Sequence, residues 1–183
     1  MRIPLKSILL SAIATVSVFA GVVYTSCNRD KCKTITCAHG GVCNDGACTC
    51  RSGYEGPGCE TVTRNKFLGN WRVFEKGSIT LGSQYAISIE ATTNITDVVI
   101  KNFYNYFKTP IKATVIGDSL FIPNQQYEGK VLFGVGKMSS ATSYGQYGYI
   151  EMRYQIIDTA TQKVNDFGYN PAVTNSDPSQ WNK

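Results

Sequence analysis

The residues of this chain best suited to covalent chemistry are its seven cysteines. Six of them lie between positions 32 and 59 with the spacing C-x4-C-x5-C-x4-C-x-C-x8-C, and Cys27 precedes them at the end of an apolar run. Structural zinc sites use close cysteine pairs such as C-x2-C, which this spacing lacks. Six thiols in so short a segment therefore predict three disulfides in an oxidising compartment, although the spacing alone leaves their pairing open. Cys27 remains without a partner.

The segment 32–60 resembles an epidermal-growth-factor-like (EGF-like) module, most clearly over residues 48–59, which read CTCRSGYEGPGC. The resemblance implies three disulfides, Cys32–Cys43, Cys37–Cys48 and Cys50–Cys59. So short a segment buries too little apolar surface to fold alone, so we expect the disulfides to supply much of its stability. Lys31 stands where calcium-binding members of the family carry a carboxylate or an amide, and His39 lies beside two glycines in an expected surface loop. We therefore expect a spacer that binds no metal ion.

Residues 1–26 have the pattern of a secretory signal peptide. Arg2 and Lys6 form a basic start, and the following residues 8–24 carry no charge. A transmembrane anchor is the alternative, because the apolar run is at the short end of what spans a bilayer. Both interpretations place the rest of the chain outside the cytoplasm, in agreement with its cysteine content.

The sequence YTSC, which ends at Cys27, resembles a bacterial lipobox, although its tyrosine replaces the usual aliphatic residue. The resemblance implies cleavage before Cys27, a diacylglycerol on its thiol, and attachment to a membrane through that lipid, with residues 27–31 as the lipidated N-terminus and spacer. Asn28 in place of aspartate implies, by analogy, the outer membrane or the cell surface of a bacterium. The leader and the Tyr/Asn-rich body resemble Bacteroidetes-type lipoproteins. The alternative is a free or intermolecularly paired Cys27 in a secreted protein.

Residues 61–65 are expected to be a linker, because the composition changes from residue 66 onward. The remaining chain lacks cysteine and alternates apolar with polar residues between turn residues, which predicts antiparallel strands. Eight strands and no convincing helix are expected, at 67–76, 84–92, 96–105, 111–117, 119–123, 130–138, 148–158 and 163–169. A meander of eight strands has two exposed edges unless it closes, so residues 66–170 predict a barrel. Residues 171–183 are polar and contain Pro171 and Pro178, so we expect a flexible tail.

The sequence Gly69-Asn70-Trp71 in the first predicted strand resembles the G-x-W motif of lipocalins and related calycin barrels. The resemblance implies that Trp71 plugs one end of the barrel and packs against an arginine of a late strand, to which Arg153 corresponds. The predicted fold class is thus mainly β, with an EGF-like module followed by an approximately eight-stranded antiparallel calycin-like β-barrel. A β-sandwich with Trp71 in its core is the alternative. The many aromatic residues indicate a filled interior more than a wide pocket.

Catalytic residues are scarce in the predicted barrel. It contains neither histidine nor cysteine, which excludes Cys–His pairs and histidine-based triads there, so a hydrolytic carboxylate pair such as Glu90 and Glu151 is the remaining alternative. The chain has a formal charge of +5 but no run of Lys or Arg that would mark a patch for nucleic acid or an anionic membrane. We expect noncatalytic binding of a protein or glycan partner at the barrel rim and loops, without a cofactor. The alternative is a carrier that holds a small apolar ligand inside the barrel.

Overall fold

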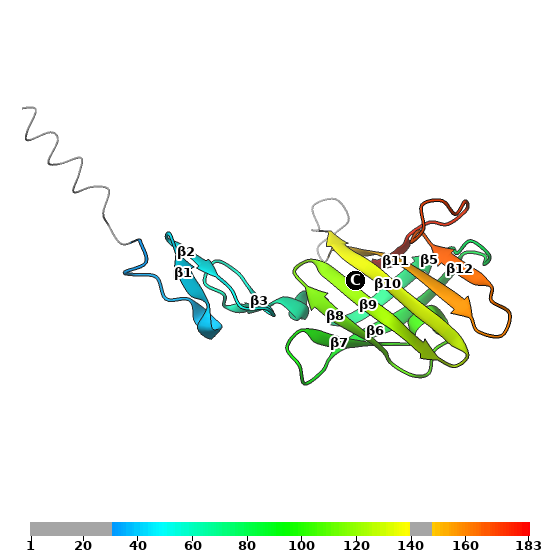
Figure 1. Ribbon diagram of the computed structural model, residues 1–183, viewed down its shortest axis with the longest axis horizontal. Helices are drawn as coiled ribbons and strands as arrows, with labels where there is room; N and C mark the ends of the chain where they lie inside the picture. The colour runs from blue at the N-terminus through cyan, green and yellow to red at the C-terminus, as the bar shows by residue number, and fades with distance from the viewer. Residues whose placement is uncertain (1–30, 140–147) are drawn as a thin grey trace, which may run out of the picture.

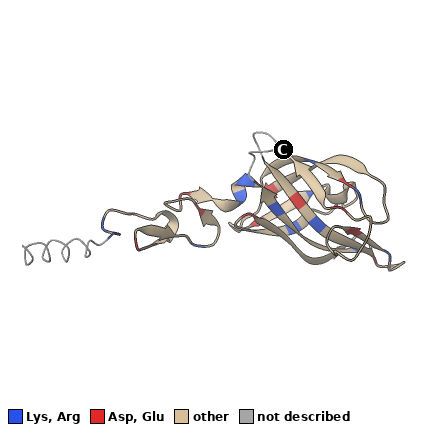
Figure 2. Cartoon of the chain, turned by 90° about the horizontal axis from the view of Figure 1, so that it is seen from above, with Lys and Arg blue, Asp and Glu red and all other residues tan. Residues whose placement is uncertain are grey.

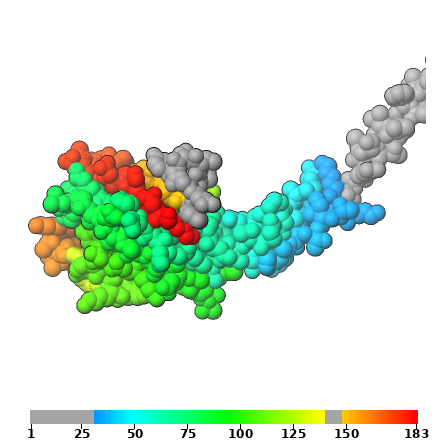
Figure 3. All heavy atoms as spheres, turned by 180° about the vertical axis from the view of Figure 1, so that it is seen from behind, coloured from blue at the N-terminus to red at the C-terminus, as the bar shows by residue number. Residues whose placement is uncertain are grey.

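The computed structural model describes residues 31–139 and 148–183. Two modules follow one another along the chain and lie end to end, a slender disulfide-bonded module and a wider barrel (Figures 1 and 3). The predicted signal peptide, residues 1–26, and the predicted lipidation site, Cys27, lie outside the described residues.

Three disulfides hold the N-terminal module together. They are the pairs that the EGF-like resemblance implies, Cys32–Cys43, Cys37–Cys48 and Cys50–Cys59. The module contains η1 (Ala38–Gly40), β1 (Val42–Asn44), β2 (Ala47–Thr49), β3 (Tyr54–Glu55) and β4 (Thr61–Val62). Asp45 and Gly46 connect β1 to β2 with positive φ values, as a tight hairpin turn requires. Because β4 pairs with β3, the module extends into the segment expected as a linker, 61–65, whose remainder lies in η2 (Thr63–Lys66).

The C-terminal module is an antiparallel β-barrel, as the alternation of apolar residues predicted. Its strands are β5 (Gly69–Glu75), β6 (Ser83–Ala91), β7 (Asp97–Lys101), β8 (Ile111–Ile116), β9 (Ser119–Tyr127), β10 (Lys130–Ser139), β11 (Tyr149–Asp158), β12 (Val164–Phe167) and β13 (Ser179–Asn182). A single turn of 3-10 helix, η3 (Phe103–Asn105), follows β7. From β5 to β11 each strand pairs with the next one in the chain (Figure 1). The sandwich alternative is wrong, because this sheet closes on itself.

The strand that closes the barrel is β13, which lies between β5 and β11. This corrects the prediction of a flexible tail at 171–183, since Ser179 and Trp181 are both buried. The predicted eighth strand forms only as the short β12, which pairs with Gln155–Ile157 at the far half of β11. Without β13, the first half of β11 and the edge of β5 would carry unpaired backbone N–H and C=O groups. The C-terminal residues form a strand because they satisfy these groups.

Aromatic side chains fill the barrel. The largest fully buried side chains are Trp71, Trp181, Tyr154, Phe67, Phe103, Phe107 and Phe167. Gly134 and Gly136 on β10 face this interior, where a Cβ atom at Gly134 would lie only 2.4 Å from the Cβ atom of Tyr154. The two glycines therefore let Tyr154 and Met152 of the neighbouring β11 occupy the space beside them.

The environment of Trp71 differs from the calycin expectation in one residue. Trp71 is buried as expected, and its Nε1 donates to the carbonyl of Phe67 at 2.7 Å. Arg153, however, lies on the outside, where it binds Glu151 at 2.7 Å and donates to the carbonyl of Gly168. The cation over the Trp71 ring is Lys183, with Nζ 5.2 Å from the ring centroid. The assignment of Arg153 to the barrel plug is therefore wrong, because β13 brings Lys183 to that end of the barrel.

The two modules are joined by side-chain bonds as well as by the chain. Lys66 binds Glu55 of the EGF-like module at 2.7 Å and Asp118 of the β8–β9 turn at 2.6 Å. Burial lowers the pKa of Lys66, but the hydrogen bonds that its ammonium group donates to Asp118 and Glu55 outweigh this effect and raise that pKa. Arg64 Nη1 donates to the carbonyls of Thr92 and Asn94 in the β6–β7 loop and to that of Asp97 at the start of β7. These contacts hold the EGF-like module against one end of the barrel.

Candidate binding groove

An open groove of about 580 Å³ lies on the outer face of the barrel. It is lined by Thr114, Phe121, Ile122, Pro123, Asn124, Phe133, Gly134, Val135 and Tyr169. We call it the lateral groove. Its walls come from β8, β9 and β10 and from the segment that follows β12, so residues far apart in the sequence form one surface.

The apolar floor of the lateral groove arises because β9 and β10 carry large apolar residues on both faces. Leu120 and Leu132 point into the barrel, whereas Phe121 and Val135 are neighbours on the outer face. The outer face of an antiparallel barrel is usually polar. Exposed aromatic side chains on this face are therefore unusual. Phe121 keeps 41% of its surface exposed.

A β-bulge shapes the centre of the lateral groove. The register between β9 and β10 shifts so that two residues, Pro123 and Asn124, lie opposite Phe133 alone. Proline lacks an N–H group and is found at bulges and strand edges, and bulges bend the strand that carries them. Within the described residues the Asn124 side chain has no hydrogen-bond partner in the protein, so its amide is available to a ligand.

Asp166 positions the third aromatic side chain of the lateral groove. This buried carboxylate accepts hydrogen bonds from the backbone N–H of Tyr169 at 3.1 Å, and from Gln155, Ser176 and the N–H of Asn170. Burial raises the pKa of Asp166, but the bonds from Ser176, Gln155 and the two N–H groups outweigh it and lower the pKa. The Tyr169 ring then meets Phe133 edge to face, at 5.0 Å between centroids. The lateral groove is thus formed before any ligand arrives.

A second polar cluster lies inside the barrel around Glu75, which is 7% exposed. Its carboxyl group accepts hydrogen bonds from the hydroxyls of Tyr85, Tyr154 and Ser179, at 2.7, 2.7 and 2.8 Å. Burial raises the pKa of Glu75 and outweighs these donors. The four residues come from β6, β11, β13 and β5, so the cluster ties together the strands that meet where the barrel closes.

The residues proposed for hydrolysis do not form this cluster. Glu90 binds Lys101 and Glu151 binds Arg153, each at 2.7 Å, on the barrel exterior. Glu75 was not predicted as a buried polar residue, although the alternation Trp71, Val73, Glu75 along β5 places it on the inward face.

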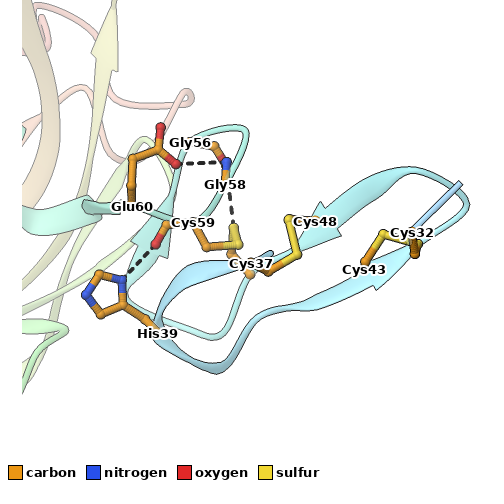
Figure 4. The surroundings of a disulfide bond; sticks show 10 residues. Cys32, Cys37, His39, Cys43, Cys48, Gly56, Gly58, Cys59 and Glu60 are labelled. Carbon is orange, nitrogen blue, oxygen red and sulfur yellow. Dashed lines mark hydrogen bonds between the residues drawn. A yellow bond between two sulfur atoms is a disulfide. The ribbon is translucent and has the colours of Figure 1, made fainter. Parts of the chain in front are cut away.

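Polar contacts in the EGF-like module support its loops (Figure 4). His39 donates from Nδ1 to the carbonyl of Cys59 at 2.9 Å and stacks on Tyr54 at 4.1 Å between ring centroids. Glu60 accepts a hydrogen bond from the N–H of Gly58 at 2.8 Å. His39 is therefore a surface loop residue. In the two described ranges no group of three or more His, Cys, Asp or Glu side chains is placed to hold a metal ion.

Comparison with known proteins identifies one of the two modules. Residues 35–62 match the family model of the teneurin-like EGF domain. The N-terminal module is EGF-like. The match ends at Val62, in agreement with the pairing of β4 with β3. The chain matches no curated protein and no solved structure. Among residues 31–139 and 148–183 there is no helix long and apolar enough to cross a membrane.

Proposed function

We propose that this protein is a lipid-anchored lipoprotein of a bacterial cell envelope that binds a partner without catalysis. Its EGF-like module is the spacer and its barrel carries the binding surface. The observation that carries the proposal is the lateral groove, in which exposed Phe121 and Tyr169 flank a bulge with a free amide at Asn124. An apolar surface with a few polar groups fits a protein segment or a glycan chain.

The packing of the barrel supports this groove over a carrier function. A carrier needs interior space for its ligand, whereas here Trp71, Trp181 and Tyr154 occupy the interior and the inward glycines of β10 are covered by β11. A partner on the outside requires no rearrangement of that core. We therefore propose that the partner binds on the side of the barrel, and not at the rim and loops that were expected from the sequence.

The pairing of the other cysteines supports lipidation of Cys27. All six cysteines of the EGF-like module are in disulfides within that module, so none is left to pair with Cys27. A thiol next to a lipobox-like sequence is then available for a diacylglyceryl group, which would attach the slender module to the outer membrane or cell surface.

Mass spectrometry of the protein purified from its own membranes tests the anchor. The expected result is an N-terminus at Cys27 carrying a diacylglyceryl group and an acyl chain, and a Cys27→Ser variant in the soluble fraction. An intact leader or an unmodified Cys27 would overturn the lipoprotein proposal.

Crosslinking on intact cells tests the lateral groove. Phe121→Ala is expected to remove a crosslinked partner that the wild-type protein retains. Phe74→Ala is the matched control, because Phe74 is 40% exposed on β5 and lies outside the groove. Equal crosslinking by both variants would contradict a role for the groove.

A further inference from the structure

The topology brings four loops to the end of the barrel opposite the EGF-like module (Figure 1). They are the loops 76–82, 102–110, 128–129 and 159–163, which we call the distal rim. Of the nine large apolar side chains that are exposed in the described residues, four belong to this end: Ile79, Leu81, Tyr106 and Val164. Leu81 is 89% exposed, more than any other in that set. Exposed aliphatic side chains gathered at one end of a protein indicate an interaction surface.

Buried polar contacts hold the loop that presents Ile79 and Leu81. Asn165 accepts a hydrogen bond from the N–H of Ile79 at 3.1 Å and donates to the Thr80 hydroxyl at 3.0 Å, and it is itself 4% exposed. A Cβ atom at Gly77 would lie 2.2 Å from the Asn165 side-chain oxygen, so only glycine fits there. The exposure of the two aliphatic side chains is therefore fixed by the fold, not by a loose loop.

The distal rim carries an excess of positive charge. Lys76, Lys108 and Lys163 are exposed and, within the described part of the chain, form no ion pair, while Lys130 binds Asp158 at 3.0 Å. Ile79, Lys130 and Lys163 line one pocket of about 160 Å³, which places them together. Elsewhere, basic and acidic residues are interspersed along the strands (Figure 2). The rim lysines are far apart in the sequence, so no local run of Lys or Arg announces them.

The acidic residues of the rim are occupied by the protein itself. Glu128 accepts the backbone N–H groups of Thr109 and Lys108, both at 2.9 Å, which lowers its pKa. Asp158 accepts a hydrogen bond from the backbone N–H of Thr161 in the following loop and another from Lys130. These contacts lower the pKa of Asp158 as well. Both carboxylates stay ionised but face their own partners, so the free charges of the rim are lysines.

We propose that the distal rim docks on the surface of an anionic lipid bilayer, with Leu81 and Ile79 entering the acyl boundary and the lysines meeting the headgroups. A large aliphatic side chain moved from water to hydrocarbon strengthens binding about ten- to hundredfold, and each lysine at an anionic surface adds about fivefold. A protein partner fits less well, because the cores of protein interfaces favour aromatic residues and arginine and are depleted of lysine. The distal rim has exposed aliphatic side chains surrounded by lysines, which is the combination that recognises an anionic bilayer.

Sedimentation with lipid vesicles tests the proposal, using the mature chain with Cys27→Ser so that no lipid anchor contributes. The protein is expected to bind phosphatidylglycerol/phosphatidylcholine vesicles, to bind pure phosphatidylcholine much more weakly, and to be released by high salt. Leu81→Ser is expected to weaken binding tenfold or more. Ile79→Ser is compared with Ile116→Ser, since these isoleucines are 60% and 61% exposed and Ile116 lies at the opposite end of the barrel.

Three results would overturn the proposal. The first is the absence of binding to anionic vesicles, and the second is equal weakening of vesicle binding by Ile79→Ser and Ile116→Ser. The third is salt-sensitive binding of the rim to immobilised polyglutamate without vesicle binding, which would assign the rim to an acidic protein partner. Circular dichroism of each variant confirms that the barrel is folded. The lateral groove and the anchor are tested by other variants, so their failure leaves this proposal standing.

Discussion

Trp181 provides the sharpest test of how the barrel closes, because it lies in the short strand that joins β5 to β11. Its side chain is 1% exposed, packs against Phe103 with ring centroids 6.0 Å apart, and donates from Nε1 to the Ser179 hydroxyl at 2.9 Å. In Trp181→Ala, the lost burial and the remaining cavity cost about 3–5 kcal/mol, and the lost hydrogen bond costs about 1 kcal/mol. Typical domains have only about 5–15 kcal/mol of stability in total.

Urea unfolding, followed by the fluorescence of Trp71 and by circular dichroism, measures this loss. With a denaturant dependence of about 2 kcal/mol per molar urea, the expected midpoint falls by roughly 2–3 M. Gln180→Ala is the matched control, because Gln180 lies on the same strand and faces solvent, and it is expected to change stability by less than about 0.5 kcal/mol. If both variants unfold at the wild-type midpoint, residues 179–182 do not close the barrel.

Three further predictions follow from the core and the disulfides. Folded Glu75 keeps its proton at pH values where the unfolded chain has lost it, so the free energy of unfolding falls as pH rises above about 4.5, and urea titrations should find a shallower fall in Glu75→Gln. Gly134→Ala is expected to cost about 1–3 kcal/mol through its clash with Tyr154, whereas Gly82→Ala, which meets no atom within 4 Å, should leave the calorimetric Tm unchanged. Dithiothreitol should unfold the EGF-like module but preserve amide protection in the barrel, and loss of that protection would contradict independent folding of the barrel.

Local sequence patterns predicted the regular part of the fold well. Cysteine spacing together with the EGF-like resemblance predicted the three disulfides. Alternation in segments such as 84–92 and 111–117 predicted β6 and β8, because one buried face imposes a period of two. The burial of Trp71 was predicted from the resemblance of Gly69-Asn70-Trp71 to the G-x-W motif.

The missed features depend on contacts between distant segments. Four residues of β13 are too few for a visible alternation, and Pro178 just before Ser179 reads as an interruption of structure. In β9, consecutive apolar residues such as Leu120 and Phe121 do not reveal which one faces outward, so the lateral groove was not visible. Arg153 was matched by its place in a late strand, but only the paired structure brings Lys183 to Trp71.

The closing strand also constrains the order in which this protein can mature. The EGF-like module is complete at Val62 and can form its disulfides as soon as that segment enters an oxidising compartment. The barrel cannot close until residues 179–182 emerge, because β13 follows every other barrel strand along the chain. Until then the edges of β5 and β11 are open templates for pairing with other chains. Synthesis of this protein therefore passes through a stage in which its EGF-like module is complete and its barrel still depends on protection from aggregation.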